Sequence, residues 1–207
     1  MLNHPEATIE ALSILRKTDN FQWYVIFMLV LVIYIYGTHL KKKDYNSICS
    51  GLMLYGIHWF VEIINALIQH YTGHALWTVP KGTSFLILIG VGVELSLMFS
   101  IAGIAAANML LPSPKDKILG IPNRLFVGVF NAGLASVLEI FLVMTPTFVW
   151  VYPWWGSITV FVTVYIPFFV GATYAHDWKP ANQRRIIGLI WAIDVFLFIF
   201  FVNIGYI

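Results

Sequence analysis

Residues 46–70 read NSICSGLMLYGIHWFVEIINALIQH, and this stretch decides the class of the fold. It is long enough to cross a bilayer, which takes about 20 residues in a helix. Near its middle it carries two ionisable side chains, His58 and Glu62. A charged side chain at the bilayer centre costs about 2.5–3.5 kcal/mol, so such residues usually face the interior of a helix bundle and mark function. The stretch therefore predicts a transmembrane helix with a polar, functional face.

The rest of the 207-residue chain has the same apolar character. Hydrophobic residues make up 59% and charged residues 11%, and the mean hydropathy is +0.81. A soluble domain carries about 45–50% apolar and about 25% charged residues. So little polar surface excludes a water-soluble enzyme, a nucleic-acid binder and a disordered chain. The net charge of +2 points to no acidic partner, and Cys49, the single cysteine, can form no internal disulfide.

Six apolar stretches in all are long enough to span a bilayer. We therefore predict an all-α fold, a polytopic bundle of six transmembrane helices in a single domain over residues 1–207. The expected spans are about 21–38, 46–70, 84–111, 125–149, 156–174 and 186–206. A polar segment precedes the first span, so we expect that span to be retained rather than cleaved as a signal peptide. Within residues 1–20, apolar residues alternate with polar ones in a way that favours an interfacial helix.

The basic residues predict the orientation in the membrane. Nine of the twelve Lys and Arg residues lie in three loops, 39–45, 112–124 and 175–185. By the positive-inside rule these loops are cytoplasmic, and both termini lie on the opposite side of the cytoplasmic membrane or its equivalent. Aromatic side chains between the fourth and fifth spans, and between the second and third, are expected to be anchors at the outer headgroup level: Trp77, Trp150, Tyr152, Trp154 and Trp155.

Five ionisable side chains fall inside the predicted spans, with no Lys or Arg near them to balance the charge. Glu94, for example, is expected about 15 Å from the outer end of its span at about 1.5 Å per residue. The carboxylates must share protons, bind a cation or face a wet cavity, because desolvation and repulsion oppose their ionisation. We therefore predict one midplane site made of His58, Glu62, Glu94, Glu139 and Asp194.

Three neutral side chains are predicted to support this site. Asn65 shares one helical face with His58 and Glu62, since the three are spaced by four and three residues. Asn131 shares a face with Glu139, which follows it by eight residues, and Trp191 precedes Asp194 by three. We expect all three to lie beside the ionisable groups.

The preferred interpretation is a membrane-embedded enzyme that acts on an apolar lipid or isoprenoid-type substrate. A carboxylic acid kept neutral by its surroundings can protonate an alkene or a carbonyl, and a nearby base can remove a proton elsewhere, which is isomerase or cyclase chemistry without a cofactor. The pattern His58-x3-Glu62, with Glu94 in the next span, resembles the emopamil-binding group of sterol isomerases. The later Asn and Trp of that group are not found here, and six spans exceed its number, so the resemblance is confined to spans two and three.

Three alternatives remain open at this point. A metal-assisted variant would use the same five side chains to bind iron or manganese. A proton- or cation-coupled transporter or channel would use them as its coupling site. A non-catalytic subunit of a membrane complex, with a membrane-protein partner or a second copy of itself, would use them to fasten helices.

Overall fold

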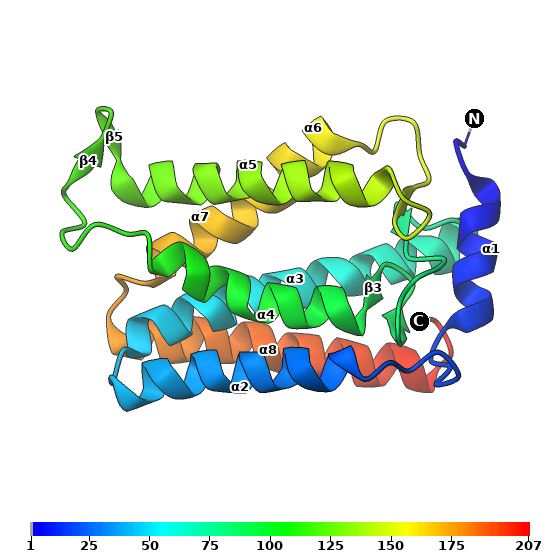
Figure 1. Cartoon of the computed structure of the whole chain (residues 1–207), viewed down its shortest axis with the longest axis horizontal. Coiled ribbons are helices and arrows are strands. Elements are labelled where there is room, and N and C mark those ends of the chain that lie inside the picture. Colours follow the sequence, from blue (N-terminus) through cyan, green and yellow to red (C-terminus); the bar gives the residue numbers. More distant parts are fainter. Residues whose placement is uncertain (1) are drawn as a thin grey trace.

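The computed structural model describes residues 2–207 and is mostly helical (Figure 1). In chain order its elements are α1 (Pro5–Ile14), α2 (Tyr24–Lys41), α3 (Tyr45–Thr72), β1 (Trp77–Thr78), β2 (Leu86–Leu88), β3 (Val91–Gly92), α4 (Val93–Ala107), β4 (Lys117–Ile118), β5 (Ile121–Pro122), α5 (Asn123–Val143), β6 (Val149–Trp150), α6 (Ser157–Val160), the π-helical turn η1 (Phe161–Tyr165), α7 (Ile166–Ala175) and α8 (Pro180–Asn203). Within residues 2–207, five helical segments are long and apolar enough to cross a membrane: α2, α3, α5, the continuous segment α6–η1–α7, and α8. The chain is a multi-pass membrane protein.

The third predicted span, 84–111, is wrong in its extent. The helix there, α4, has 15 residues and begins at Val93, so it covers about 22 Å of a hydrocarbon core of about 30 Å. The residues before it form the β2–β3 hairpin instead, which turns through Gly90. Apolar composition alone does not separate a buried hairpin from a helix, and the glycines at this point favour the hairpin. The six predicted spans thus become five long helices and one shorter helix.

The two ends of the bundle differ in what they contain (Figure 1). At one end lie the α2–α3 connection, the β4–β5 hairpin and the α7–α8 connection, which contain the three loops rich in Lys and Arg. At the other end lie α1, the C-terminus, the β2–β3 hairpin and the connection from α5 to α6. We call these the basic end and the capped end.

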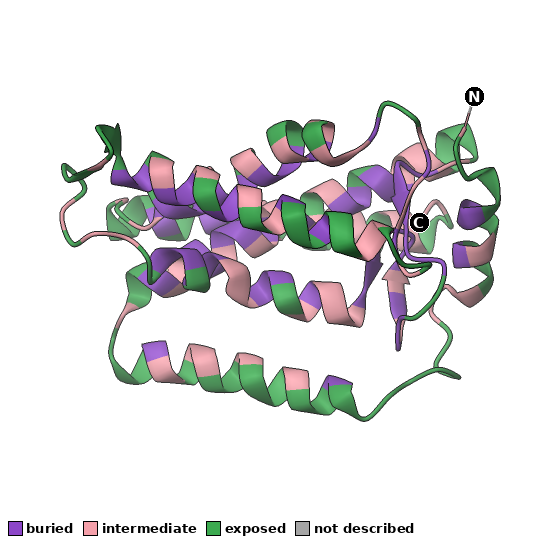
Figure 2. Cartoon of the chain, turned by 45° about the horizontal axis from the view of Figure 1, so that its top comes forward, coloured by how far each residue is buried: buried purple, intermediate pink, exposed green. Residues whose placement is uncertain are grey.

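Helix α3 is the centre of the packing, with α4, α7 and α8 against it. Gly103 of α4 lies directly on the backbone of Ser50 in α3, where a Cβ atom would clash with the Ser50 carbonyl oxygen. The absence of a side chain at Gly103 therefore lets α4 pack closely against α3. By contrast α2, the lowest helix in Figure 2, buries only Val25 and His39. Its exposed apolar side chains are suited to contact with lipid.

Residues on both sides of α3 explain where this helix begins and ends. Asp44 precedes it, and its carboxylate accepts a hydrogen bond of 3.2 Å from the Ser47 amide, which satisfies one of the free N–H groups of the first turn. Gly73 ends the helix in the left-handed conformation, with φ of 80°, which glycine adopts without steric cost.

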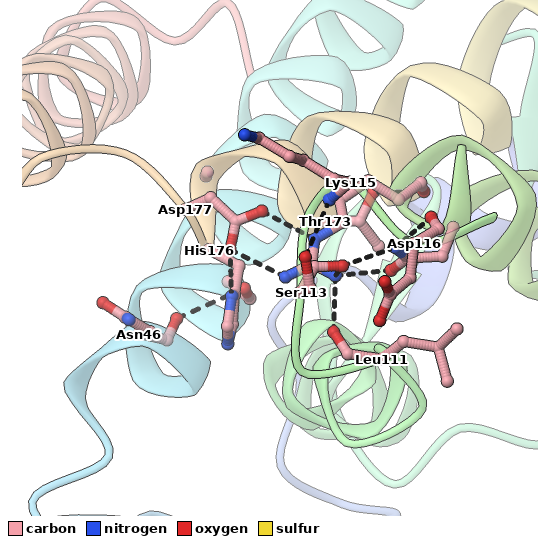
Figure 3. A network of polar contacts seen from close by, with 12 residues as sticks. Asn46, Leu111, Ser113, Lys115, Asp116, Thr173, His176 and Asp177 are labelled. Carbon is pink, nitrogen blue, oxygen red and sulfur yellow. Dashed lines mark hydrogen bonds and ion pairs between the residues drawn. The ribbon is translucent and has the colours of Figure 1, made fainter.

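A buried arginine fastens the basic end. Arg124, 3% exposed at the start of α5, makes a two-point ion pair with Asp177, with N–O distances of 2.6 and 2.9 Å. It also donates to the carbonyl oxygens of Leu111 and Ser113, which lie in the connection from α4 to α5 (Figure 3). The arginine thus joins three segments of the chain: the α4–α5 connection, α5 and the α7–α8 connection.

Candidate functional site

The candidate site is a cavity of about 230 Å³ inside the bundle. Its wall is mostly apolar and is formed by α3, α4, α5, the segment α6–η1–α7 and the connections at the capped end. Five of its lining side chains carry groups that can exchange a proton or donate and accept hydrogen bonds: His58, Glu62, Asn131, Glu139 and Tyr165. Three of the five predicted ionisable site residues therefore come together, and two do not.

His58 and Glu62 lie on one face of α3, as the spacing predicts, and both are buried. Nδ1 of His58 is 3.9 Å from Oε1 of Glu62, which is an ion-pair separation rather than a hydrogen bond. The His58 ring stacks on Phe99, with 4.3 Å between ring centroids. Among residues 2–207, Nε2 of His58 and Oε2 of Glu62 have no hydrogen-bond partner. Two buried polar atoms of residues that line the cavity thus have no hydrogen-bond partner, and Oε2 of Glu62 faces the Gly90 turn, where an added Cβ atom would lie 2.7 Å from it and 2.4 Å from Nε1 of Trp77.

Glu139 is held differently, because both of its carboxylate oxygens accept hydrogen bonds. The Trp150 indole N–H donates to Oε1 over 2.6 Å. The Tyr165 hydroxyl donates to Oε2. An ionised carboxylate only accepts hydrogen bonds, so these two donors fix its position and satisfy part of its capacity. Glu62 and Glu139 therefore have separate roles available to them, one with a free oxygen and one anchored.

Tyr165 owes its position to an irregularity in the helix. It is the last residue of η1, where the amide of Ile166 donates to the carbonyl of Phe161, five residues back. Ile166 is followed by Pro167, which has no amide hydrogen and whose ring crowds the carbonyl four residues earlier. A widened turn relieves this crowding, and π-helical turns of this kind occur frequently at functional sites.

The capped end of the cavity is closed by an aromatic roof. Trp77 and Trp155 stack with 5.4 Å between ring centroids, and both are less than a tenth exposed. Trp77 lies in β1 opposite Trp150 of β6. The pairing of these two strands therefore positions both a ring of the roof and Trp150, which donates to Glu139. The two rings separate the cavity from the connections at the capped end.

Asn65, predicted as a supporting residue, holds this roof in place. Its side-chain oxygen accepts from the Leu76 amide over 2.8 Å, and its side-chain nitrogen donates to the Trp77 carbonyl over 2.9 Å. Gly90 of the β2–β3 turn packs against the same group, and a Cβ atom there would lie 2.7 Å from Oε2 of Glu62. Only glycine fits at this contact, which brings the turn onto α3.

Asn131, the second predicted supporting residue, also lines the cavity. Its side-chain nitrogen donates to the Val127 carbonyl over 2.9 Å and contacts the sulfur of Met109 at 3.4 Å. Met109 follows α4, so this contact joins α4 and α5 at the basic end of the cavity.

Glu94 is not part of this site, contrary to the sequence-based expectation. It is the second residue of α4, and its carboxylate accepts from the Tyr24 hydroxyl over 2.5 Å, from the Thr83 hydroxyl over 2.6 Å and from the Ser84 amide over 2.6 Å. Because the span begins at Val93 rather than at residue 84, Glu94 lies at a helix end and not at mid-depth. There it ties α2 and the segment before the β2–β3 hairpin to α4.

Asp194 and Trp191 are not part of the cavity either. They lie in α8 beside Trp59 and Phe198, in a separate apolar groove. The Trp191 indole donates to the Leu52 carbonyl over 3.1 Å, which fastens α8 to α3. Both Asp194 carboxylate oxygens are buried without a hydrogen-bond partner. Trp191 thus lies in one groove with Asp194, as its spacing predicts, but this groove is separate from the cavity.

The metal-assisted variant is not supported by this arrangement. Among residues 2–207, no three His, Cys, Asp or Glu side chains are grouped closely enough to hold a metal ion. The physical reason is the separation just described: the five expected ligands lie in three places, at the cavity, at the start of α4 and in the α8 groove. The five-residue iron or manganese site is thus not assembled.

Sequence reasoning missed four residues of the site. Tyr165 is not among the predicted site residues, and Trp77, Trp150 and Trp155 are expected at the headgroup level. Pro167, two residues after Tyr165, is the one sequence signal that marks this part of the span as irregular. Nothing in the local sequence distinguishes an indole that anchors a helix in lipid from one that donates to a buried carboxylate.

Comparisons with known proteins agree with the membrane assignment. A family model described as "Uncharacterized membrane protein family" matches residues 5–203. A protein of Archaeoglobus fulgidus, described as "Uncharacterized protein", is 40% identical over 204 residues, which are 96% of this chain and 97% of that protein. Chloride channel protein C of Dictyostelium discoideum is 30% identical over 117 residues, which are 51% of this chain but only 15% of that protein. No solved structure matches. Since the family model covers nearly the whole chain, the protein belongs to this uncharacterized membrane protein family.

Proposed function

We propose that this protein is a membrane-embedded isomerase or cyclase that moves protons on an apolar lipid or isoprenoid-type substrate bound in the cavity. The observation that carries the proposal is the pair Glu62 and Glu139 on one mostly apolar cavity, one with an unpartnered oxygen and the other anchored by two donors. A largely apolar pocket with a few convergent polar groups is the usual form of a small-molecule site. Two carboxyl groups in unlike surroundings are suited to different roles, one as a proton donor and the other as an ionised group that stabilises positive charge.

In the proposed reaction Glu62 is the general acid. Its proton adds to one carbon of a substrate double bond, and the electron pair of that bond forms the new C–H bond. The positive charge left on the neighbouring carbon is stabilised by the Glu139 carboxylate and by the faces of the surrounding aromatic rings. Loss of a proton from an adjacent carbon to His58 then forms the shifted double bond. One proton enters and one leaves, so no oxidant or reductant is required.

The orientation of the protein forms part of the proposal. We place the basic end in the cytoplasm and the capped end, with both termini, on the opposite side of the membrane. The three loops rich in Lys and Arg lie together at the basic end, as the positive-inside rule requires of cytoplasmic loops (Figure 1).

The test is exchange of lipid hydrogen for deuterium. Purified protein is reconstituted in vesicles made from the total lipid extract of the membranes in which it naturally occurs, and the vesicles are incubated in D₂O. Mass spectrometry then measures deuterium at carbon positions of each lipid class. We expect one class to gain deuterium with the wild-type protein and not with Glu62→Gln. The matched control is Glu94→Gln, which makes the same change outside the cavity.

Two outcomes contradict the proposal. If no lipid class gains deuterium at carbon above protein-free vesicles, the proton chemistry is absent. If the same vesicles instead show a proton flux that depends on Glu62, without deuterium in the lipids, the cavity belongs to a proton-coupled carrier.

A further inference from the structure

The cavity has walls of unequal exposure, and the difference shows where a ligand enters. The residues that line it from α3, α6, η1, α7 and the capped end are buried or only partly exposed. Every exposed lining residue comes from α4 or α5, two from each helix: Met98, Ala105, Leu134 and Leu138. A cavity meets the outside where its lining is exposed, so this one opens between α4 and α5.

The opening is bounded at its two ends. Toward the basic end the contact of Asn131 with Met109 closes the space between the two helices. Toward the capped end the buried Trp77–Trp155 roof closes the cavity. The opening is therefore a side opening that faces outward from the bundle, between two closed ends.

The side chains around the opening are apolar, which suits contact with lipid rather than with water. Met98 is 40%, Leu134 47% and Leu138 55% exposed, and Ala102 and Ala105 complete the α4 side with small groups. The small alanine side chains leave room between the helices, and no charged residue lines the cavity from α4. Since α5 crosses the membrane and α4 runs beside it, this apolar rim faces the hydrocarbon region of the bilayer.

From these observations we infer that the cavity is entered sideways from the bilayer, through a portal between α4 and α5, by an uncharged lipid with an unsaturated hydrocarbon chain. The inference rests on the proposed function in treating the bound lipid as a substrate. It adds that this substrate is uncharged and has an unsaturated hydrocarbon chain. The rim offers no partner for a phosphate or other charged headgroup, so the chain enters and any headgroup stays in the bilayer or at its surface. Once inside, the chain lies beside the side chains of His58, Glu62 and Glu139, which line the cavity.

The test uses a light-activated lipid probe, so its result does not depend on catalysis. A long-chain unsaturated alcohol that carries a diazirine near the end of its chain is added to proteoliposomes and irradiated. Mass spectrometry of the digested protein then locates the labelled residues. In the wild-type protein we expect labels on cavity residues that are not exposed on the outer surface, such as Phe168 and Val164.

Two variants decide whether the path runs through the portal. Ala105→Trp fills the rim and is expected to remove the labels inside the cavity while labels on the outer surface of α2 persist. Leu125→Trp makes a comparable change on the exposed face of α5 outside the cavity lining and is expected to leave the cavity labels unchanged. Cavity labels that persist in Ala105→Trp overturn the portal, and absence of cavity labels in the wild-type protein overturns the lipid ligand.

Failure of the proposed function gives a different result. If deuterium exchange is absent but the probe labels the cavity and Ala105→Trp blocks it, the portal stands and the chemistry is wrong. If exchange depends on Glu62 but Ala105→Trp affects neither labels nor exchange, the chemistry stands and the portal is wrong.

Discussion

Tyr165 donates a hydrogen bond to the carboxylate of Glu139, although the two residues lie in different membrane-crossing segments, α5 and the segment α6–η1–α7. Both side chains are less than a tenth exposed. The bond connects the irregular turn η1 to Glu139, the cavity carboxylate whose two oxygens both accept a hydrogen bond. It is the contact through which a change in one helix would reach the proposed reaction.

Tyr165→Phe removes this donor and keeps the ring. We expect deuterium exchange to fall, because Glu139 then loses one of the two groups that fix its charge and position. The loss of one buried hydrogen bond should lower the free energy of unfolding by about 1 kcal/mol. Tyr174→Phe is the control, since Tyr174 is an exposed tyrosine of the same segment. Equal exchange in the two variants would show that the Tyr165 hydroxyl takes no part.

Glu139→Gln and Glu94→Gln should have different effects, although the sequence predicts that both residues belong to one site. Sequence reasoning predicts that both substitutions abolish activity. The structure instead predicts that Glu139→Gln abolishes exchange, because Glu139 lines the cavity, whereas Glu94→Gln lowers thermal stability and retains exchange, because Glu94 binds Tyr24, Thr83 and Ser84. Exchange and thermal unfolding in detergent are measured on both. Loss of exchange in a stable Glu94→Gln protein would restore Glu94 to the site.

These two glutamates show what the sequence can and cannot predict. The spacing of His58, Glu62 and Asn65 places them on one helical face wherever the helix ends, so their proximity is predicted from the sequence. The depth of Glu94 depends on where its helix begins, and that depends on a hairpin whose turn fits against α3 only because Gly90 has no side chain. Such a contact between distant segments leaves no local pattern.

The helical class and most spans are predicted well because they follow from apolar length alone. The site residues from the capped end are not predicted, because their positions depend on contacts between distant segments of the chain. Trp150 approaches Glu139 because β6 pairs with β1 across a long stretch of chain, and two-residue strands have no detectable periodicity. The predicted grouping of Asp194 with the other acids failed because α8 packs against α3 on a different side from the cavity.

Gly90→Ala should destabilise the protein. The added methyl group would lie within 2.7 Å of the Glu62 carboxylate and about as close to the Asn65 side chain, so the β2–β3 turn must move away from α3. Overpacking of this kind costs about 1–3 kcal/mol. In Gly133→Ala the new methyl group meets no atom within 4 Å, and alanine favours the helix by up to about 1 kcal/mol. Thermal unfolding of both variants should therefore shift in opposite directions, and a shift in the same direction would argue against the close contact at Gly90.

Asp177→Asn should weaken the basic end in a way that depends on pH. Burial raises the pKa of Asp177, but hydrogen bonds from Arg124 and His176 and the charges on these residues outweigh that effect, so its pKa lies below the ordinary 3.8. A lowered folded-state pKa stabilises the protein above the ordinary value, and this contribution is lost as the pH falls through the folded-state pKa. The variant should be less stable at about pH 7, by about 2 kcal/mol for lost charged hydrogen bonds, and should approach the wild type as the pH falls below 3.8 and through the folded-state pKa. A stability difference that stays constant across this range would show that the ion pair does not contribute through the charge of Asp177.

Asp194→Leu should stabilise the protein without affecting exchange. Both carboxylate oxygens of Asp194 are buried without partners, and a polar group in that position costs free energy that no hydrogen bond returns. Leucine is similar in size and suits a groove formed by Trp59, Val195 and Phe198. We expect thermal unfolding of the variant to shift upward, with deuterium exchange equal to that of the wild type. Loss of exchange would instead show that the carboxyl group of Asp194 affects the cavity across α3. The site would then include every predicted acidic residue except Glu94.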